Sequence, residues 1–273
     1  MRTSSARKEL KYIVERIPSD VQINSAISTY LQRSISSYGP QDRAIAFCRS
    51  KQQVTDLADL FKVEPYYAVY EDDEAIEKNR MTKEKWLSGE NKIMVSTSIL
   101  GCGMDYPHIR DVIHRDPSFT MLDQYQEDSR GGRDGLECRA TTFVVDKKVY
   151  RVPDQPYDLG TQVLYESLSN TDQCRRIAST LYLDGQSKQC VSIPGAIFCD
   201  FCEKSAGLSV PITLPPPPPP PSPPRRIRDV FYKSPAEALQ DFLAPKIKNT
   251  HSLDSTSSGS SKKLKVAHIG SDV

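Results

Sequence analysis

The alternation of short apolar segments with amphipathic ones over the first 150 residues constrains the fold most strongly. Helical periodicity covers residues 21–35, 54–61, 73–88 and 119–130. Strand candidates lie between these segments: "LKYIV" (10–14), "RAIAFC" (43–48), "YYAVY" (66–70), "NKIMVST" (91–97), "DVIH" (111–114) and "ATTFVV" (140–145). Strands alternating with helices need crossover connections, which favour parallel pairing. The pattern therefore predicts an α/β fold, a mostly parallel sheet with helices on both faces.

The composition changes after residue 145. Residues 151–170 are expected to be a loop and residues 171–184 a helix. The run "PITLPPPPPPPSPP" (211–224) excludes a helix interior and predicts an extended polyproline spacer. Docking of this run in an aromatic groove of a partner protein is the alternative. From Lys246 onward the chain lacks the apolar surface that folding needs, so we expect a disordered tail.

Cysteine usage and the absence of targeting signals bear on the cellular compartment. The N-terminus "MRTSSARKELKYIV" lacks the apolar core of a signal peptide, and no apolar run reaches the length of a membrane span. Seven cysteines are an odd number, so a disulfide framework is not expected. We predict a soluble intracellular chain with reduced thiols. The formal net charge of +1 neither favours nor excludes a nucleic-acid partner.

The segment "QYQEDSRGGRDG" (124–135) is a candidate phosphate site. Arg130 and Arg133 lie three positions apart beside two glycines. The guanidinium group stays charged and offers a planar fork of donors that matches phosphate oxygens. If the preceding helix persists to residue 133, both arginines share one face. A solvated charged turn, or a contact of the RGG type with nucleic acid, is the alternative.

A second candidate site follows a predicted strand. The segment "IMVSTSILGCGMDYP" (93–107) leaves its strand at Thr97 and enters a loop that contains Gly101, Gly103 and Asp105. In open parallel sheets, ligands collect at the carboxyl ends of the strands. A hydroxyl group there can meet a phosphate, and a carboxylate can accept from a ribose hydroxyl. An ordinary strand-to-turn connection is the alternative.

Three segments in this order and at this spacing resemble motifs IV, V and VI of superfamily 2 helicases. They are "AIAFCRS" (44–50), "IMVSTSILGCGMDYPHIRDVIHRDPS" (93–118) and "QYQEDSRGGRDG" (124–135), and the resemblance covers residues 43–145. The last is similar to the RecQ pattern Q-E-x-G-R-A-G-R-D-G. Seven residues match it: Gln126, Glu127, Arg130, Gly132, Arg133, Asp134 and Gly135. Ser129 and Gly131 stand where Gly and Ala are usual, and both are small. The resemblance implies a RecA-like lobe.

The resemblance implies roles at the nucleotide. Arg130 and Arg133 would reach across a cleft between two lobes toward the phosphates of ATP, and Arg133 would be the transition-state finger. Gln126 would orient the cleft. Together with the loop after Thr97, this leads us to expect both arginines at the carboxyl edge of the sheet, facing a nucleotide that another surface holds.

The resemblance also implies contacts made by the loops. Gly103 and Asp105 would lie on the nucleotide side of the cleft, while Ser50 and Thr97 would contact the DNA backbone. One departure concerns the step after the third strand, where such helicases often carry His-Ala-Gly or a similar sequence. This chain has "YED" (70–72), whose carboxylates would repel a phosphate backbone.

The printed sequence contains no P-loop, G-x-x-x-x-G-K-[ST], and no Asp-Glu-x-His after an apolar strand. The acidic run "DDEAI" (72–76) opens a charged helix and is not a metal site. We therefore expect the second lobe of a 3′–5′ ATP-dependent DNA helicase of RecQ type, which hydrolyses ATP negligibly by itself. ATP and Mg²⁺ would be held by a first lobe, in the full-length protein or in trans. A non-catalytic DNA-binding or scaffold remnant stays open.

Four cysteines have the spacing C-x15-C-x8-C-x2-C, which is typical of a closed structural zinc site. They are Cys174, Cys190, Cys199 and Cys202. Buried free thiols are the alternative. The segment "TDQCRRIASTLYLDG" predicts a helix capped near Thr171, with the first cysteine of the four in its first turn. The other three cysteines, at 48, 102 and 138, fit no ligand spacing.

The RecQ resemblance extends to this region, because that family follows its second lobe with a zinc subdomain that opens on "CRR". It implies either phosphate contacts or a solvated helix face for Arg175 and Arg176. We divide the chain into a lead-in (1–20), a helicase lobe (21–150), a zinc subdomain (151–208) and a proline-rich linker with a basic tail (209–273).

Two short basic runs, "RRIR" (225–228) and "KKLK" (262–265), are candidates for nuclear localisation or phosphate binding. The RecQ resemblance implies DNA repair and recombination in the nucleus, with DNA and a first helicase lobe as partners. His108 and His114 have no nucleophile or acid nearby in the sequence, so we expect both to be structural.

Overall fold

The computed structural model describes residues 5–69, 72–98, 105–146 and 159–207. The chain divides into two compact units, residues 1–212 and 213–273, and the second lies wholly outside the described residues. The predictions for the proline run, the basic runs and the tail fall there. Within the described ranges, no helix is both long enough and apolar enough to cross a membrane.

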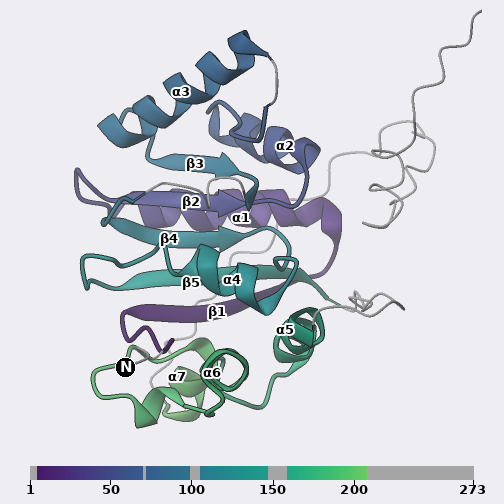
Figure 1. Ribbon diagram of the computed structural model, residues 1–273, viewed down its shortest axis with the longest axis vertical. Helices are drawn as coiled ribbons and strands as arrows, with labels where there is room; N and C mark the ends of the chain where they lie inside the picture. The colour runs from purple at the N-terminus through teal and green to yellow at the C-terminus, as the bar shows by residue number, and fades with distance from the viewer. Residues whose placement is uncertain (1–4, 70–71, 99–104, 147–158, 208–273) are drawn as a thin grey trace, which may run out of the picture. The chain divides into compact units, whose positions relative to one another are not determined.

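The structure confirms the parallel sheet (Figure 1). Its five strands pair in the order β1-β5-β4-β2-β3, and every pairing is parallel. Their bounds are β1 (Leu10–Ile17), β5 (Cys138–Val145), β4 (Ile109–His114), β2 (Arg43–Phe47) and β3 (Ile93–Ser96). The lead-in segment is thus an edge strand of the sheet, next to the last strand along the chain.

Helices cover both faces, as predicted. They are α1 (Asp20–Ile35), α2 (Lys51–Phe61), α3 (Asp73–Ser88), α4 (Met121–Asp128), α5 (Leu159–Ser169), α6 (Arg176–Asp184) and α7 (Asp200–Ser205). Alternate side chains of a strand point to opposite faces. In β2, Ala44 and Ala46 therefore pack with the buried residues of α1 and α2. Ile45 and Phe47 pack on the other face with Trp86 of α3.

Three local predictions were wrong. Of the predicted strand 66–70, the described residues form only a single bridge, Tyr66 to Ser96, and the carbonyl of Tyr67 accepts from Asn79 Nδ2 (2.8 Å) instead of extending a ladder. The predicted loop 151–170 contains α5, which buries Leu164 and Leu168 against β5 and α4. The predicted helix 171–184 begins only at residue 176, so Cys174 precedes it.

Candidate functional site

The two arginines of the candidate phosphate site lie in a turn at the amino edge of the sheet, which we call the arginine turn (residues 129–135). The amide of Gly132 donates to the carbonyl of Ile109, the first residue of β4 (3.1 Å). The amide of Cys138, the first residue of β5, donates to the carbonyl of Glu9 beside the start of β1 (3.0 Å). The expected position at the carboxyl edge is therefore wrong.

The chain connection explains this position. Helix α4 starts after the carboxyl end of β4 and must return along the sheet before the parallel strand β5 can begin (Figure 1). Whatever follows its last residue, Asp128, therefore lies at the amino edge. Asp105 also lies toward this edge, because it comes only four residues before the first residue of β4.

The arginine turn separates its two arginines. Helix α4 ends at Asp128, so they do not share a helix face. Arg130 is buried, with 8% of its surface exposed. Arg133 is exposed, and its Nη1 atom lies 2.6 Å from Oδ1 of Asp105. Only Arg133 is thus presented to a ligand at the surface.

Two glycines let the arginine turn lie close to the sheet. A Cβ atom on Gly131 would lie 2.2 Å from the sulfur of Cys138. Gly132 has a φ of +62°, and a Cβ there would lie 2.8 Å from the carbonyl oxygen of Leu136. Side chains at these positions would collide or be strained. Gly131, where the RecQ pattern usually has Ala, therefore leaves room for Cys138.

Asp134 anchors the far end of the arginine turn. Its carboxylate accepts from Arg110 Nη1 (3.0 Å) and pairs with His108 Nδ1 (2.7 Å), while Arg110 Nε also reaches Asp42 (2.8 Å). Partial burial raises the pKa of Asp134, but the hydrogen bonds from Arg110, the Leu136 amide and His108 outweigh it and hold this pKa below its ordinary value. These contacts fix the backbone next to Arg133.

The predicted DNA-contact residues lie at the opposite, carboxyl edge. Ser50 follows β2, is exposed, and caps α2 by accepting from the amide of Gln53 (3.2 Å). Thr97 follows β3, the neighbouring strand, and its amide donates to the carbonyl of Tyr66 (3.3 Å). The structure thus places these two residues at one edge and the arginine turn at the other.

Three further predicted residues have mixed outcomes. Gln126 is exposed on α4, close to the arginine turn in sequence. Gly103 lies outside the described residues, as do the first two residues of "YED". Asp72, the third, accepts from the amide of Ala75 (3.1 Å) and caps α3, a structural use of its carboxylate. "DDEAI" accordingly forms a helix start.

A buried polar cluster at the carboxyl end of β4 was missed. His114 is fully buried, and its Nε2 lies 2.8 Å from Asp128 while its Nδ1 lies 3.3 Å from Glu127. Ser118 also bonds to Glu127. Burial lowers the pKa of His114, but the hydrogen bonds and charges of the two carboxylates outweigh it and raise this pKa to about 9. The sequence offers no signal, since the partners lie 13 and 14 positions apart.

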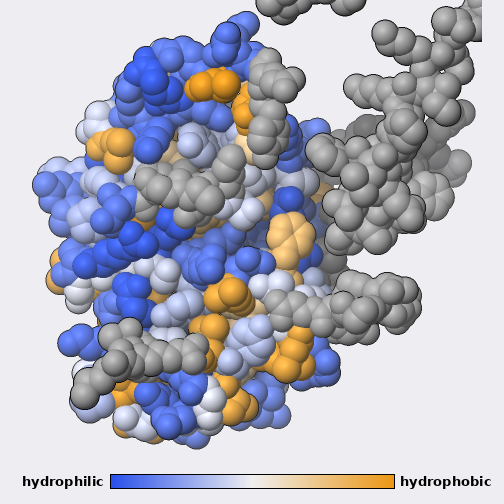
Figure 2. All heavy atoms as spheres, in the orientation of Figure 1, coloured by the Kyte–Doolittle hydropathy of each residue, from blue (hydrophilic) through white to orange (hydrophobic). Residues whose placement is uncertain are grey.

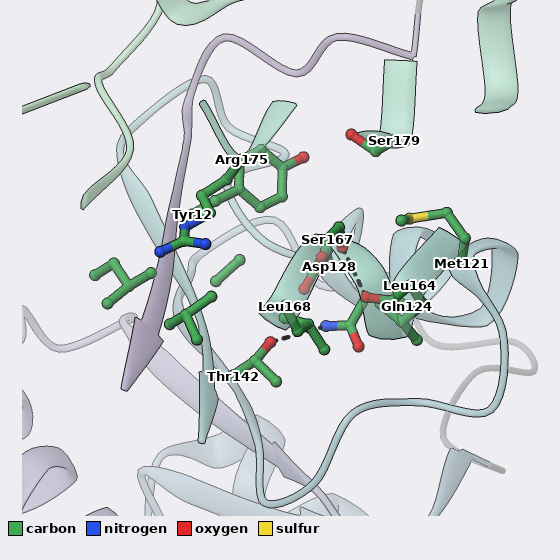
Figure 3. Close-up of a pocket in the computed structure, with 13 residues that line it drawn as sticks. Tyr12, Met121, Gln124, Asp128, Thr142, Leu164, Ser167, Leu168, Arg175 and Ser179 are labelled. Atoms are coloured by element: carbon green, nitrogen blue, oxygen red, sulfur yellow. Dashed lines mark hydrogen bonds between the residues drawn. The ribbon is translucent and has the colours of Figure 1, made fainter. Parts of the chain in front are cut away.

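A small pocket lies between β1, β5 and helices α4 to α6 (Figure 3). Its polar lining includes Gln124, Asp128 and Arg175, and Gln124 Nε2 donates to Thr142 (3.2 Å). The cavity volume is about 50 Å³. Pockets that hold small molecules typically measure about 300–1,000 Å³. This pocket is therefore too small for a nucleotide.

The face that carries α4 and α5 is largely hydrophilic, with separate apolar patches (Figure 2). Leu122 of α4 and Leu159 of α5 are exposed there. Phe119 is also exposed, and the guanidinium carbon of Arg49 lies 5.0 Å from the centre of its ring. Apolar residues scattered in this way are normal on a folded surface and do not mark a docking site.

The four cysteines with zinc-like spacing come together. All four are buried, and their sulfur atoms lie within 4.8 Å of one another. Cys174 lies 3.5 Å from Cys190 and 3.8 Å from Cys199, sulfur to sulfur. Four thiolates bound to one zinc at ~2.3 Å would be separated by about 3.8 Å. The arrangement therefore fits a tetrahedral metal ion.

Backbone amides around the cluster favour negative charge on sulfur. The hydrogen bonds among the thiols lower the pKa of Cys190 and raise that of Cys174, so they place the first negative charge on Cys190. Three amides point at sulfur: that of Cys190 at Cys174 (3.3 Å), that of Cys199 at Cys190 (3.4 Å) and that of Arg175 at Cys199 (3.5 Å). Amide donors of this kind stabilise sulfur-borne negative charge. Outside the cluster, Cys48 and Cys138 are buried free thiols, and residue 102 is not described.

Arg175 and Arg176 both bind groups of the protein itself, so the predicted solvated helix face was wrong for both, and phosphate contacts stay a prediction. Arg175 makes a two-pronged ion pair with Asp200 (2.8 and 3.0 Å). Arg176 is 1% exposed and donates to the carbonyls of Arg7 and Leu10 (both 2.6 Å). Its Nε atom donates to the sulfur of Cys190 (3.3 Å). Arg176 therefore joins the cysteine cluster to the start of β1.

Comparison with known proteins adds independent information. Residues 25–135 match the family model for the helicase conserved C-terminal domain. The ATP-dependent DNA helicase Q1 of Pongo abelii is 31% identical over 129 residues, which cover 45% of this chain and 19% of the relative. The putative ATP-dependent DNA helicase Q1 of Caenorhabditis briggsae is 28% identical over 173 residues, which cover 59% of this chain and 27% of the relative.

This chain therefore spans about a fifth to a quarter of the length of these two relatives. Among solved structures, the DEAD-box protein SrmB of E. coli, bound to regulator of ribonuclease activity A, is 16% identical. The match covers 51% of this chain and 79% of that one, with a TM-score of 0.43.

Proposed function

Because the chain carries the C-terminal lobe of a RecQ-type superfamily 2 helicase, we propose that it is one half of an ATP-dependent 3′–5′ DNA-helicase motor. In this proposal it supplies Arg133 to an ATP molecule that a first RecA-like lobe holds. The single observation that carries the proposal is the exposed guanidinium of Arg133, within the motif match and at the amino edge of the sheet. Without a first lobe, the chain hydrolyses ATP negligibly.

The geometry supports different roles for the two arginines. Arg133 is accessible and can exchange its carboxylate partner, Asp105, for the phosphates of a nucleotide presented from outside the lobe. A planar fork of donors suits that exchange. Arg130 is buried and would support the turn from within unless lobe closure exposes it. Gln126, exposed on α4, would contact the first lobe.

DNA would bind at the opposite edge of the sheet. Ser50 and Thr97 follow neighbouring strands there, where their hydroxyl groups can meet a phosphate backbone. Separate edges allow one lobe to touch both the nucleotide and the DNA. This arrangement suits a motor in which closure of the two lobes on ATP changes how tightly this lobe binds a DNA strand.

Residues 171–205 would bind one structural zinc ion. The fit of the four sulfur atoms to a tetrahedron and the three amides aimed at them support this assignment. When bound, zinc supplies folding energy to a module that otherwise has a small apolar core. The proposed roles in DNA repair or recombination come from the family likeness alone, and the proposed nuclear location comes from that likeness and from the basic runs at 225–228 and 262–265.

The test is ATP turnover with and without single-stranded DNA. The chain by itself is expected to show none. Addition or fusion of a first RecA-like lobe from a RecQ-type helicase should produce DNA-dependent turnover. Arg133→Ala should then lower it by roughly 10³–10⁵-fold, the usual effect of losing an arginine finger. Arg80→Ala, in an exposed ion pair on α3, is the matched control and should change nothing.

A non-catalytic DNA-binding role is the second candidate. The burial of Arg130 and the existing pairing of Arg133 with Asp105 favour it, because neither arginine is unoccupied. In that case the chain would bind single-stranded DNA in a salt-dependent way, while the two-lobe protein would show no turnover that depends on Arg133. Turnover by the chain alone would contradict both candidates.

A further inference from the structure

Arg7, in the segment that precedes β1, makes two hydrogen bonds to the backbone of the arginine turn. Its Nη1 atom donates to the carbonyl of Ser129 and its Nη2 atom to the carbonyl of Gly131, both at 2.8 Å. The side chain is only 23% exposed. These two carbonyls flank Arg130, and that of Ser129 also accepts from Nε of Arg133 (3.3 Å). One guanidinium thus spans the start of the turn.

The position of Arg7 is itself fixed from both sides. Its Nε atom is paired with Glu9, whose Cγ atom would lie 2.9 Å from a Cβ atom on Gly132. The carbonyl of Arg7 accepts from Nη1 of the buried Arg176 (2.6 Å). A side chain held in this way loses little further entropy when it binds the two carbonyls, so its contacts are preorganised.

We propose that Arg7 is a positioning residue of the helicase lobe: it holds the arginine turn closed against the sheet and so sets the direction of the Arg133 guanidinium. The structural part of this inference stands on the contacts alone. Its consequence for ATP hydrolysis rests on the proposed function. Arg7 touches neither nucleotide nor DNA in this proposal, and it acts through the backbone of residues 129–131.

The sulfur of Cys138 offers a readout that does not depend on ATP. It is fully buried beneath Gly131, which leaves no room for even a methyl group between them. If the turn opens, this thiol becomes accessible to an alkylating reagent. The rate of alkylation at Cys138, followed by peptide mass spectrometry, therefore reports on closure of the turn in the full chain.

The experiment compares Arg7→Ala and Arg7→Lys with Arg16→Ala. Arg16 is the matched control, because it lies on β1 near its other end and also donates to two carbonyls, those of Leu168 (2.8 Å) and Ser169 (3.3 Å). Arg7→Ala should raise the alkylation rate at Cys138 by about tenfold, as expected for the loss of a charge-assisted hydrogen bond. Arg7→Lys should restore part of the protection, and Arg16→Ala should leave the rate unchanged.

In the two-lobe protein, Arg7→Ala should lower kcat by about 10- to 100-fold with little change in KM for ATP, because a misdirected finger affects the reaction more than nucleotide binding. An unchanged alkylation rate at Cys138 in a folded Arg7→Ala protein overturns the positioning role. If Arg7→Ala does not fold, an unchanged rate in Arg7→Lys overturns it instead. Faster alkylation with unchanged kcat, where Arg133→Ala does abolish turnover, supports the contact but overturns the positioning of Arg133 by Arg7. Turnover that survives Arg133→Ala overturns the proposed function itself. The two failures are thus distinguishable.

Discussion

Arg133 and Asp105 form an ion pair (Nη1 to Oδ1, 2.6 Å) that joins two loops 28 residues apart at the amino edge of the sheet. The Asp105 side chain is 86% exposed, so water competes for both partners. Exposed ion pairs contribute little to stability. The ion pair therefore orients the Arg133 side chain but contributes little to the stability of the fold.

We expect Arg133→Ala to change the free energy of unfolding by no more than about 1 kcal/mol. Arg176→Ala should cost about 3 kcal/mol or more, since it leaves the buried carbonyls of Arg7 and Leu10 without this donor. Urea denaturation followed by circular dichroism measures both. A loss as large in Arg133→Ala as in Arg176→Ala would make Arg133 a structural residue and remove the basis for its proposed role.

Gly131 and Cys138 should be coupled. Gly131→Ala places a methyl group 2.2 Å from the sulfur of Cys138, so we expect destabilisation of about 1–3 kcal/mol from overpacking. Adding Cys138→Ala removes the colliding sulfur and should recover most of that loss. A double-mutant cycle in urea denaturation gives the coupling energy. Additive single effects would show that the turn does not pack on Cys138 in solution.

Stability should fall as the pH rises through the titration of His114. Its folded-state pKa of about 9 exceeds the ordinary value of 6.5, so its contribution is fully present below about pH 6.5 and is lost toward pH 9 and above. The buried imidazolium loses its interaction with Asp128 and Glu127 when it is deprotonated. The full effect is about 3 kcal/mol.

The measurement is the free energy of unfolding at pH 6.5 and pH 9.5 for the natural chain and for His114→Gln. The difference between the two pH values should shrink markedly in the variant. His108→Gln, which alters a partly exposed histidine at the amino edge, is the control and should keep the natural pH dependence. Equal pH dependence in the natural chain and His114→Gln would contradict the charged buried cluster.

Zinc removal should unfold residues 171–205 and leave the sheet intact. We expect about one zinc per chain by atomic absorption, and loss of that zinc in Cys202→Ser. Treatment with a chelator should make the segment sensitive to protease while the helicase lobe keeps its circular dichroism signal. Cys48→Ala, which alters a buried thiol outside the cluster, should keep its metal. Full zinc content in Cys202→Ser would refute the four-ligand site.

Much of the lobe was determined by the sequence alone. The period of the apolar residues located the strands and helices up to residue 145 to within a few residues, except for the predicted strand 66–70, because burial of one face dictates that period. Motif spacing singled out Arg133, whose role stays a prediction, and cysteine spacing singled out four sulfur atoms that the structure brings within 4.8 Å. The apolar period is a local signal, and the motifs and cysteines occur in a recognisable order and spacing. Both kinds of signal can therefore be read from one sequence.

Three-dimensional packing decided which edge of the sheet each group occupies. The return of α4 along the sheet placed Arg133 at the amino edge, although the loop chemistry predicted the carboxyl edge. Arg7 reached the arginine turn from more than 120 positions away, and His114 acquired two acidic partners in the interior. Such contacts depend on strand order and on helices folding back over the sheet. The sequence around one residue of such a contact therefore does not predict which residue it will contact.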